Sequence, residues 1–311
     1  MTEPLKLHHP WLVAIWPGMG NVALTAGYYL LARLEMHLFA ELEARDLFDV
    51  DHVEVKAGII QPGRRPRNRL FSWTDPAGKH DLVVFLGEAQ PPVGKYAFCV
   101  KLIEYARRLG VERVFTFAAM ATQMHLSQRS RVFGAATDDK NLEELKRLEL
   151  ELLQDGQIGG LNGVLLAAAA QAGLPGSCLL GEMPHIFSQF PFPRASLAIL
   201  EVFTTIAGIE LDLAELTQQA QVVERQLEEF LSRVEQTYGP QASTEEAGYN
   251  PEPAEEERLT PVQRQRIERL FAEAKKDRPK AFELKQELDR LGAFKKYEDR
   301  FLDLFKREGD S

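Results

Sequence analysis

A glycine turn near the N-terminus has the residue types of a phosphate-binding site. Gly18, Gly20 and Asn21 directly follow an apolar run at residues 11–16 and open a helical pattern. The spacing fits the loose G-x-G-x-x-A form of a dinucleotide-binding turn, in which glycines let the backbone approach a ligand and free N–H groups bind an anion. The acidic residue that should end the next strand is absent, because residues 52–58 end in Lys-Ala-Gly. Three interpretations stay open: a dinucleotide, a different ligand, or a tight turn without a ligand.

Further polar and glycine-rich segments also follow expected strands. Glu88 and Gln90 come after one apolar run and Thr122 after the next, while Gly159 and Gly160 lie in a loop that opens an alanine-rich helix. Ligand sites of open parallel sheets collect at the carboxyl ends of the strands, so we expect one shared crevice. The alternative for Glu88 is that it caps the following helical region. The ligand-binding candidates are Gly18, Gly20, Asn21, Glu88, Gln90, Thr122, Gly159 and Gly160.

Two other features are candidates for contacts with a partner. Four arginines occupy six positions at residues 64–69, and Arg64, Arg65 and Arg67 could bind phosphate or an acidic surface. Such a run is also typical of a solvated hairpin tip. The second feature is the apolar face of a long helix at residues 212–238, which includes Leu227 and Phe230. That face either binds a partner helix or covers the sheet.

No residue pattern favours catalysis or a metal. The seven histidines show no His-x-x-x-His spacing, and the glycine-rich loop lacks the Gly-Lys-Ser/Thr ending of a nucleotide-binding P-loop. Cys99 and Cys178 both fall in apolar stretches, where a thiol serves as a small hydrophobic group. A nucleophile elbow of the form Gly-x-Ser-x-Gly does not occur. We therefore expect no catalytic residue, no metal and no cofactor.

Composition narrows the class of protein. The chain has 311 residues with 37 Lys and Arg against 46 Asp and Glu, a net charge of −9, which makes nucleic acid an improbable partner. The two cysteines exclude a disulfide scaffold. No apolar run approaches the ~18 residues of a membrane span. The first residues, Met-Thr-Glu-Pro-Leu, lack the basic and apolar regions of a signal peptide, so a cytoplasmic protein without membrane contact is expected.

The order of apolar runs and helical patterns predicts the fold class. Most of the runs lack strict alternation, which suits strands buried on both faces of a sheet. Strands are expected at residues 11–16, 52–60, 81–87, 111–118 and 177–183, and helices at 21–45, 95–109, 139–154, 161–172 and 194–206. Residues 70–73 and 131–135 add shorter antiparallel pieces. We predict an α/β fold with three layers, in which helices cover both faces of a mainly parallel sheet.

The distribution of charge and proline predicts three parts. Residues 1–238 form the α/β core domain, which ends in the long amphipathic helix, and residues 239–259 form a linker rich in proline, glycine and polar residues. Residues 260–311 form a charged helical bundle, because Thr260-Pro261 is typical of a helix start. Its helices are expected at 262–274, 279–291 and 295–306.

Four edge segments occur in an order that resembles the proteasome assembly chaperone 2 family. They are Trp16-Pro17-Gly18-Met19-Gly20-Asn21, Gly87-Glu88-Ala89-Gln90-Pro91, the glycine-rich loop at 156–163, and Leu180-Gly181-Glu182-Met183-Pro184. The resemblance covers roughly residues 10–236. It implies a fold similar to that of purine nucleoside phosphorylases, homo-oligomers among prokaryotic members, and chaperones that dock on proteasome α-subunits.

Two properties associated with that family lack support in these residues. Archaeal chaperones of the family dock through a C-terminal hydrophobic–Tyr–X tail, whereas this sequence ends in Arg-Glu-Gly-Asp-Ser, so docking by that route is not expected. Some members have been labelled ATP-grasp-like enzymes, but no arrangement of lysines and magnesium-binding carboxylates supports that label here.

Two hypotheses of function follow. The first is an oligomeric, non-catalytic binding or assembly protein that contacts copies of itself, as a trimer or a larger assembly, and a second protein. The alternative is an enzyme or sensor that binds a nucleoside- or phosphate-type small molecule in the crevice at the carboxyl edge of the sheet.

Overall fold

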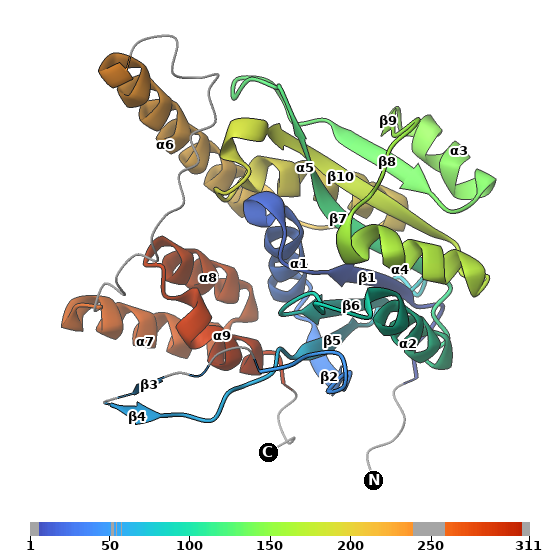
Figure 1. Ribbon diagram of the computed structural model, residues 1–311, viewed down its shortest axis with the longest axis horizontal. Coiled ribbons are helices and arrows are strands. Elements are labelled where there is room, and N and C mark those ends of the chain that lie inside the picture. The colour runs from blue at the N-terminus through green and yellow to red at the C-terminus, as the bar shows by residue number, and fades with distance from the viewer. Residues whose placement is uncertain (1–5, 51–52, 54, 57, 239–258, 307–311) are drawn as a thin grey trace.

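The computed structural model describes residues 6–50, 53, 55–56, 58–238 and 259–306. An eight-stranded sheet in the order β2-β5-β6-β1-β7-β10-β8-β9 runs through the molecule (Figure 1). The strands are β1 (Trp11–Ile15), β2 (His37–Glu41), β5 (Asn68–Trp73), β6 (Leu82–Gly87), β7 (Arg113–Thr122), β8 (Val132–Ala136), β9 (Glu151–Leu152) and β10 (Gly176–Pro184). The central strands β6, β1, β7 and β10 are parallel, whereas β5 and β8 are antiparallel to their central neighbours.

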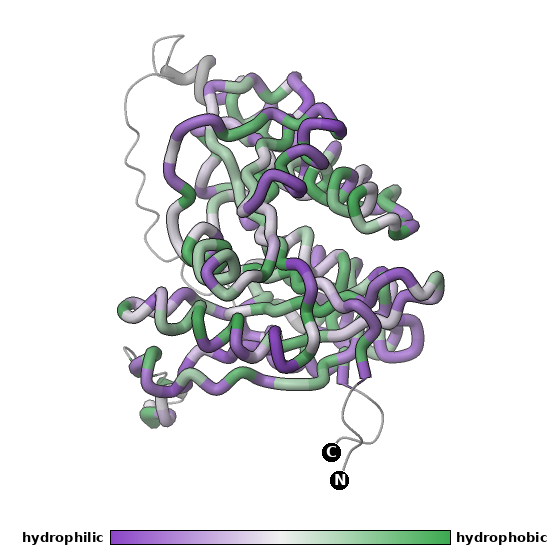
Figure 2. Tube along the Cα trace, turned by 90° about the vertical axis from the view of Figure 1, so that its right-hand side faces the viewer, coloured by the Kyte–Doolittle hydropathy of each residue, from purple (hydrophilic) through white to green (hydrophobic). Residues whose placement is uncertain are grey.

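Helices cover both faces of the sheet. They are α1 (Val22–Arg33), α2 (Lys95–Arg108), α3 (Asp139–Arg147), α4 (Gly160–Gln171), α5 (Pro193–Ala207) and α6 (Ala214–Tyr238). Alternate residues of β1 enter two separate hydrophobic clusters: Val13 and Ile15 pack on the side of α1 and α5, and Leu12 and Ala14 on the side of α2 and α4. Figure 2 shows apolar segments running through the middle of the molecule. The expected α/β fold with three layers is confirmed.

The C-terminal helices pack against the α1 side of the sheet. They are α7 (Pro261–Lys276), α8 (Ala281–Arg290) and α9 (Phe294–Asp303). Aromatic contacts join them to the sheet and to α1, with ring centroids 4.6 Å apart for Tyr29 and Phe282 and 6.0 Å apart for Phe71 and Phe305. The N–H of Leu38 on β2 donates to the carbonyl of Phe305 at 2.6 Å. These helices therefore share one hydrophobic cluster with α1, and Phe305, just after α9, covers the sheet edge.

The helix start predicted at Thr260 is present. The Thr260 side chain accepts from the backbone N–H of Gln263, and the Gln263 side chain accepts from that of Thr260, which makes a capping box. The linker prediction falls on residues that lie outside the described part of the chain, except for Leu259. The division into a core domain and a separate bundle stays a prediction.

Two expected helices are wrong in extent. The helix predicted at 21–45 ends at Arg33, because Glu35 takes a left-handed conformation (φ 49°) and the chain then forms edge strand β2. The helix predicted at 139–154 ends at Arg147, and Glu149 at φ 56° turns the chain into β9. In both cases a left-handed residue stops a helix that the apolar spacing alone extends.

The strand predicted at 52–60 is also absent from the main sheet. Its described residues form β3 (Val55–Lys56) and β4 (Ile59–Ile60), which pair with each other in a separate two-stranded sheet. Gly58 at φ 80° supplies the turn between them. By contrast, the antiparallel pieces expected at 70–73 and 131–135 are confirmed as parts of β5 and β8.

Candidate functional site

The glycine turn is bonded to the rest of the protein. The N–H of Gly20 donates to the Ser188 carbonyl at 3.0 Å, and the N–H of Asn21 donates to the Gly18 carbonyl at 3.1 Å. Gly20 has φ 59°, and a Cβ atom added there would lie 2.8 Å from Sδ of Met183. Glycine is thus favoured at Gly20 by the left-handed backbone, and these two N–H groups already have acceptors within the protein.

Replacing Gly20 by Val is expected to lower the free energy of unfolding by at least about 2 kcal/mol. A β-branched residue is strained in the left-handed region, and its methyl groups would overlap Met183. Gly18→Val is the matched control, because Gly18 is extended and no heavy atom lies within 4 Å of its added Cβ. Urea unfolding of both variants measures the difference, and equal stability of the two would contradict this account of the turn.

Glu88 lies directly after β6 and is enclosed by arginines. Its carboxylate accepts from Arg69 Nη1 at 2.6 Å and from the backbone N–H of Arg67 at 2.9 Å, and it forms an ion pair with Arg64 at 3.3 Å. The side chain of Arg69 is 0% exposed and that of Glu88 is 2% exposed. Glu88 is therefore the buried counter-ion of an arginine cluster.

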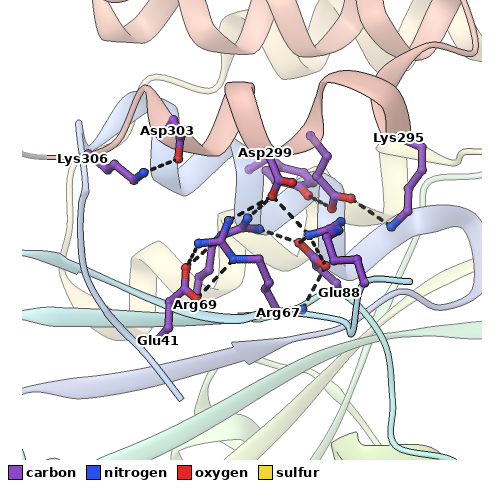
Figure 3. Close-up of polar contacts among 11 residues, drawn as sticks. Glu41, Arg67, Arg69, Glu88, Lys295, Asp299, Asp303 and Lys306 are labelled. Carbon is purple, nitrogen blue, oxygen red and sulfur yellow. Dashed lines mark hydrogen bonds and ion pairs between the residues drawn. The ribbon is translucent and has the colours of Figure 1, made fainter. Parts of the chain in front are cut away.

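The arginine cluster connects the sheet to α9 (Figure 3). Asp299 on α9 pairs with Arg64, Arg67 and Arg69, and Glu41 on β2 pairs with Arg67 and Arg69. Burial alone would raise the pKa of Asp299, but the three arginines hold it below its usual value. Three of the four arginines thus make internal ion pairs with carboxylates from distant parts of the chain. The fourth, Arg65, is exposed and donates to the carbonyl of Phe48 at 3.0 Å.

A second buried glutamate lies at the end of β10. Glu182 accepts from Nε and Nη2 of Arg131 at 2.8 and 2.7 Å and from Oγ1 of Thr122 at 2.8 Å. These bonds, that of Arg131 above all, lower the pKa of Glu182. Thr122 therefore binds a carboxylate of the chain itself.

Replacing Arg131 by Gln is expected to lower the free energy of unfolding at pH 7, because the buried Glu182 carboxylate loses its charged donor. A depressed carboxyl pKa stabilises the fold above the unfolded value of about 4.3, and that stabilisation is lost as pH falls through the folded value. The difference in free energy of unfolding between wild type and Arg131→Gln should therefore be smaller at pH 3 than at pH 7. Arg129→Gln, which removes a pair between exposed side chains, should change stability by less than about 0.5 kcal/mol. Urea unfolding at pH 7 and pH 3 measures these differences. A loss of stability in Arg131→Gln that does not depend on pH would contradict the role of Arg131 as the charged donor to Glu182.

The remaining edge candidates belong to the start of α4. Gln90 Oε1 accepts from the backbone N–H of Leu161 at 3.1 Å and so caps that helix. Gly160 has φ 67°, and its added Cβ would lie 2.8 Å from Gln90 Oε1. Gly159 has open space beside it. None of these three residues lines the cleft that Asn21 and Glu88 line, so the structure does not bring all the candidates into one crevice.

A cleft of about 1000 Å³ opens where the carboxyl ends of β1 and β6 meet α1, α6, α8 and α9. Of the predicted site residues, Asn21, Glu88 and Leu227 line it, and Gly18, Gly20, Gln90, Thr122, Gly159 and Gly160 do not. Its apolar lining includes Leu24, Phe190, Val222, Val223 and Leu270. The cleft therefore depends on the C-terminal helices, which sequence reasoning did not place near the sheet edge.

Exposed apolar side chains gather at the mouth of this cleft. Phe190 and Val222 line it, and the rings of Phe190 and Phe230 lie 6.0 Å apart. We call Phe190, Val222 and Phe230 the edge patch; they are 40%, 39% and 48% exposed. Phe230 was predicted as a partner contact, whereas Phe190 and Val222 were missed, because nothing in their sequence neighbourhood distinguishes exposed from buried apolar residues. Leu227, the other predicted residue of this helix, is 7% exposed.

The described residues contain neither a metal-binding cluster nor a membrane-spanning helix. They contain no group of three or more His, Cys, Asp or Glu side chains arranged to hold a metal ion. None of their helices is long and apolar enough to cross a membrane.

Comparison with known proteins gives consistent matches. The model of the PAC2 family matches residues 12–231. The Methanocaldococcus jannaschii protein MJ1210 is 27% identical over 237 residues, which are 73% of this chain and 84% of that protein. PbaB of Pyrococcus furiosus, described as an archaeal proteasome activator, has a TM-score of 0.63 at 25% identity, covering 75% of this chain and 96% of PbaB. A PAC2 family protein of Streptomyces avermitilis has a TM-score of 0.61 at 26% identity, covering 71% and 95%. Helices α7–α9 lie beyond the family match.

Proposed function

The chain belongs to the PAC2 family, as its motifs predicted, and we propose that it is a non-catalytic protein of the assembly-chaperone type. It associates with copies of itself, as a trimer or a larger assembly in the cytoplasm, and holds a second protein. The observation that carries the proposal is the edge patch, where three apolar side chains are exposed beside a large cleft.

The chemistry of the edge supports binding rather than catalysis. Glu88 and Glu182, the buried carboxylates at the ends of β6 and β10, are held by arginines of neighbouring segments. Burial raises the pKa of Cys99 and of Cys178 to about 12, so neither thiol ionises near neutral pH. All four groups are thus buried or paired within the fold.

The composition of the edge patch supports contact with protein. Exposed aromatic side chains next to a concave surface are typical of interface hot spots, because they bury a large apolar area at a small cost in side-chain entropy. Met19 and Ile186, which are 45% and 52% exposed, extend the apolar surface on two segments joined by the hydrogen bond from Gly20 to Ser188.

The cleft favours a second candidate, the binding of a small molecule. Its volume lies at the upper end of the range for ligand pockets. A nucleotide or phosphosugar fits it poorly, because the cations that line it already pair with carboxylates. A thermal-shift screen tests this candidate. A ligand present at a concentration one hundred times its dissociation constant raises the free energy of unfolding by about 2.7 kcal/mol.

Affinity capture from the native cell extract tests the assembly proposal. Wild type, Phe230→Asp and the control Val262→Asp, which changes an exposed apolar residue of α7 outside the patch, are used as baits. We expect the same protein on wild type and control and its loss from Phe230→Asp. A set of captured proteins that does not change among the three baits would contradict a role for the edge patch.

A further inference from the structure

The charges that line the cleft are not balanced. Its lysines and arginines each pair with a carboxylate that also lines it. The pairs are Arg266 with Glu287 at 3.2 Å, Arg290 with Glu287 at 2.7 Å, Lys285 with Asp289 at 2.5 Å, and Lys295 with Glu298 at 2.9 Å. Since the cations are already bonded, an anionic ligand would have to break these pairs.

The acceptors on the wall between α6 and α8 are different. Glu283, in the first turn of α8, is exposed and forms no hydrogen bond or ion pair with the described residues, although its charge acts on Lys280. Glu215, in the first turn of α6, forms an ion pair with Arg33 at 3.3 Å. Burial raises the pKa of Glu215, Arg33 acts against this, and the charge of Glu283 raises it further. One turn further along α6, Oε1 of Gln219 is buried and accepts no hydrogen bond from the described residues. This wall therefore holds two mutually repelling carboxylates and an unpaired carbonyl oxygen.

The groups that satisfy such a wall are N–H donors with positive charge. An ammonium or guanidinium would neutralise Glu283 and donate to Gln219, while its methylene stem packs on the apolar lining of Leu24, Val222 and Val223. A cleft of about 1000 Å³ is too large for one side chain, and the edge patch continues the apolar surface at its mouth. The occupant must then combine basic and apolar residues.

We propose that the cleft binds a basic, amphipathic segment of a partner polypeptide, with its lysine or arginine side chains at the wall formed by Glu215, Gln219 and Glu283. This inference rests on the proposed function, because it names the kind of protein segment that an assembly chaperone of this structure would hold. The C-terminal helices take part directly, since α8 carries Glu283 and α7 contributes Leu270 to the lining.

Fluorescence anisotropy with two labelled helical peptides of equal length tests the proposal on the full chain. One peptide contains only leucine and lysine, and the other only leucine and glutamate. We expect saturable binding of the lysine peptide alone, and an at least tenfold higher dissociation constant for Glu283→Lys. Glu104→Lys makes the same charge change on an exposed residue of α2, on the other face of the sheet. It should change the dissociation constant of the lysine peptide less than threefold. Equal effects of the two variants, or binding of both peptides, would overturn the proposal.

Two further outcomes separate the sources of the cation and the two proposals. Spermidine is added as a competitor of the labelled lysine peptide. If spermidine displaces the peptide at concentrations similar to those of unlabelled peptide, the site binds an amine without a polypeptide, and the inference is overturned. Selective peptide binding by a monomeric wild type would support the cleft site and remove the assembly proposal. A self-associating wild type that binds neither peptide would support the assembly proposal and remove the cleft site.

Discussion

Replacing Arg69 by Met is expected to lower the free energy of unfolding by about 3–5 kcal/mol, the range found when one partner of a buried ion pair is removed. Arg69 is fully buried on β5, and its guanidinium binds Glu88 and Asp299. Methionine fills much of the same volume but leaves the Glu88 carboxylate in the interior without its closest cation. The effect should therefore come from the lost charge rather than from a cavity.

Two further variants make this expectation specific. Arg65→Met removes an arginine of the same run that is exposed and bonds one backbone carbonyl, so it should change stability by less than about 1 kcal/mol. Adding Glu88→Gln to Arg69→Met removes the unpaired buried charge and should restore part of the loss. Urea unfolding at pH 7 measures all three. Equal losses for Arg69→Met and Arg65→Met would contradict the idea that this cluster holds α9 on the sheet.

Replacing Phe230 by Asp is expected to raise the dissociation constant for self-association by at least about thirtyfold. Losing a hot-spot aromatic at an interface costs about 2 kcal/mol or more, and each 1.4 kcal/mol is a factor of ten. The fold should stay intact, because Phe230 is half exposed and, among the described residues, its ring contacts that of Phe190 alone. Sedimentation velocity over a range of concentrations gives the dissociation constant.

Val262→Asp is the matched control for this prediction. Val262 is 76% exposed on α7, so the same type of change is made outside the edge patch. It should leave the dissociation constant within threefold of wild type. If both variants weaken self-association to the same degree, the interface lies elsewhere on the molecule.

The sheet was largely predictable because its signals are local. The mainly apolar runs at β1, β6, β7 and β10 lack strict alternation and so mark strands buried on two faces, and the capping box at Thr260 marks the start of α7. Where single residues reverse the backbone, as at Glu35 and Glu149, the apolar spacing continues past the true end of the helix. Such left-handed residues other than glycine leave no clear trace in a sequence.

The site was less predictable because its contacts join distant residues. Arg69 was recognised as part of a basic run, but its partner Asp299 lies 230 positions away on a helix assigned to a separate bundle. Its apolar neighbours Leu70 and Phe71 were the available signal that this arginine is buried in a strand. Similarly, the cleft exists because α8 lies opposite α6, and no spacing in the sequence indicates that arrangement.

The molar mass of the wild-type protein in solution tests the central claim most directly. Light scattering coupled to size exclusion, repeated from low to high micromolar protein, measures that mass without any assumption about the interface. The account predicts a stable multiple of 35.1 kDa, threefold or larger. A mass of 35.1 kDa across the whole range would contradict it.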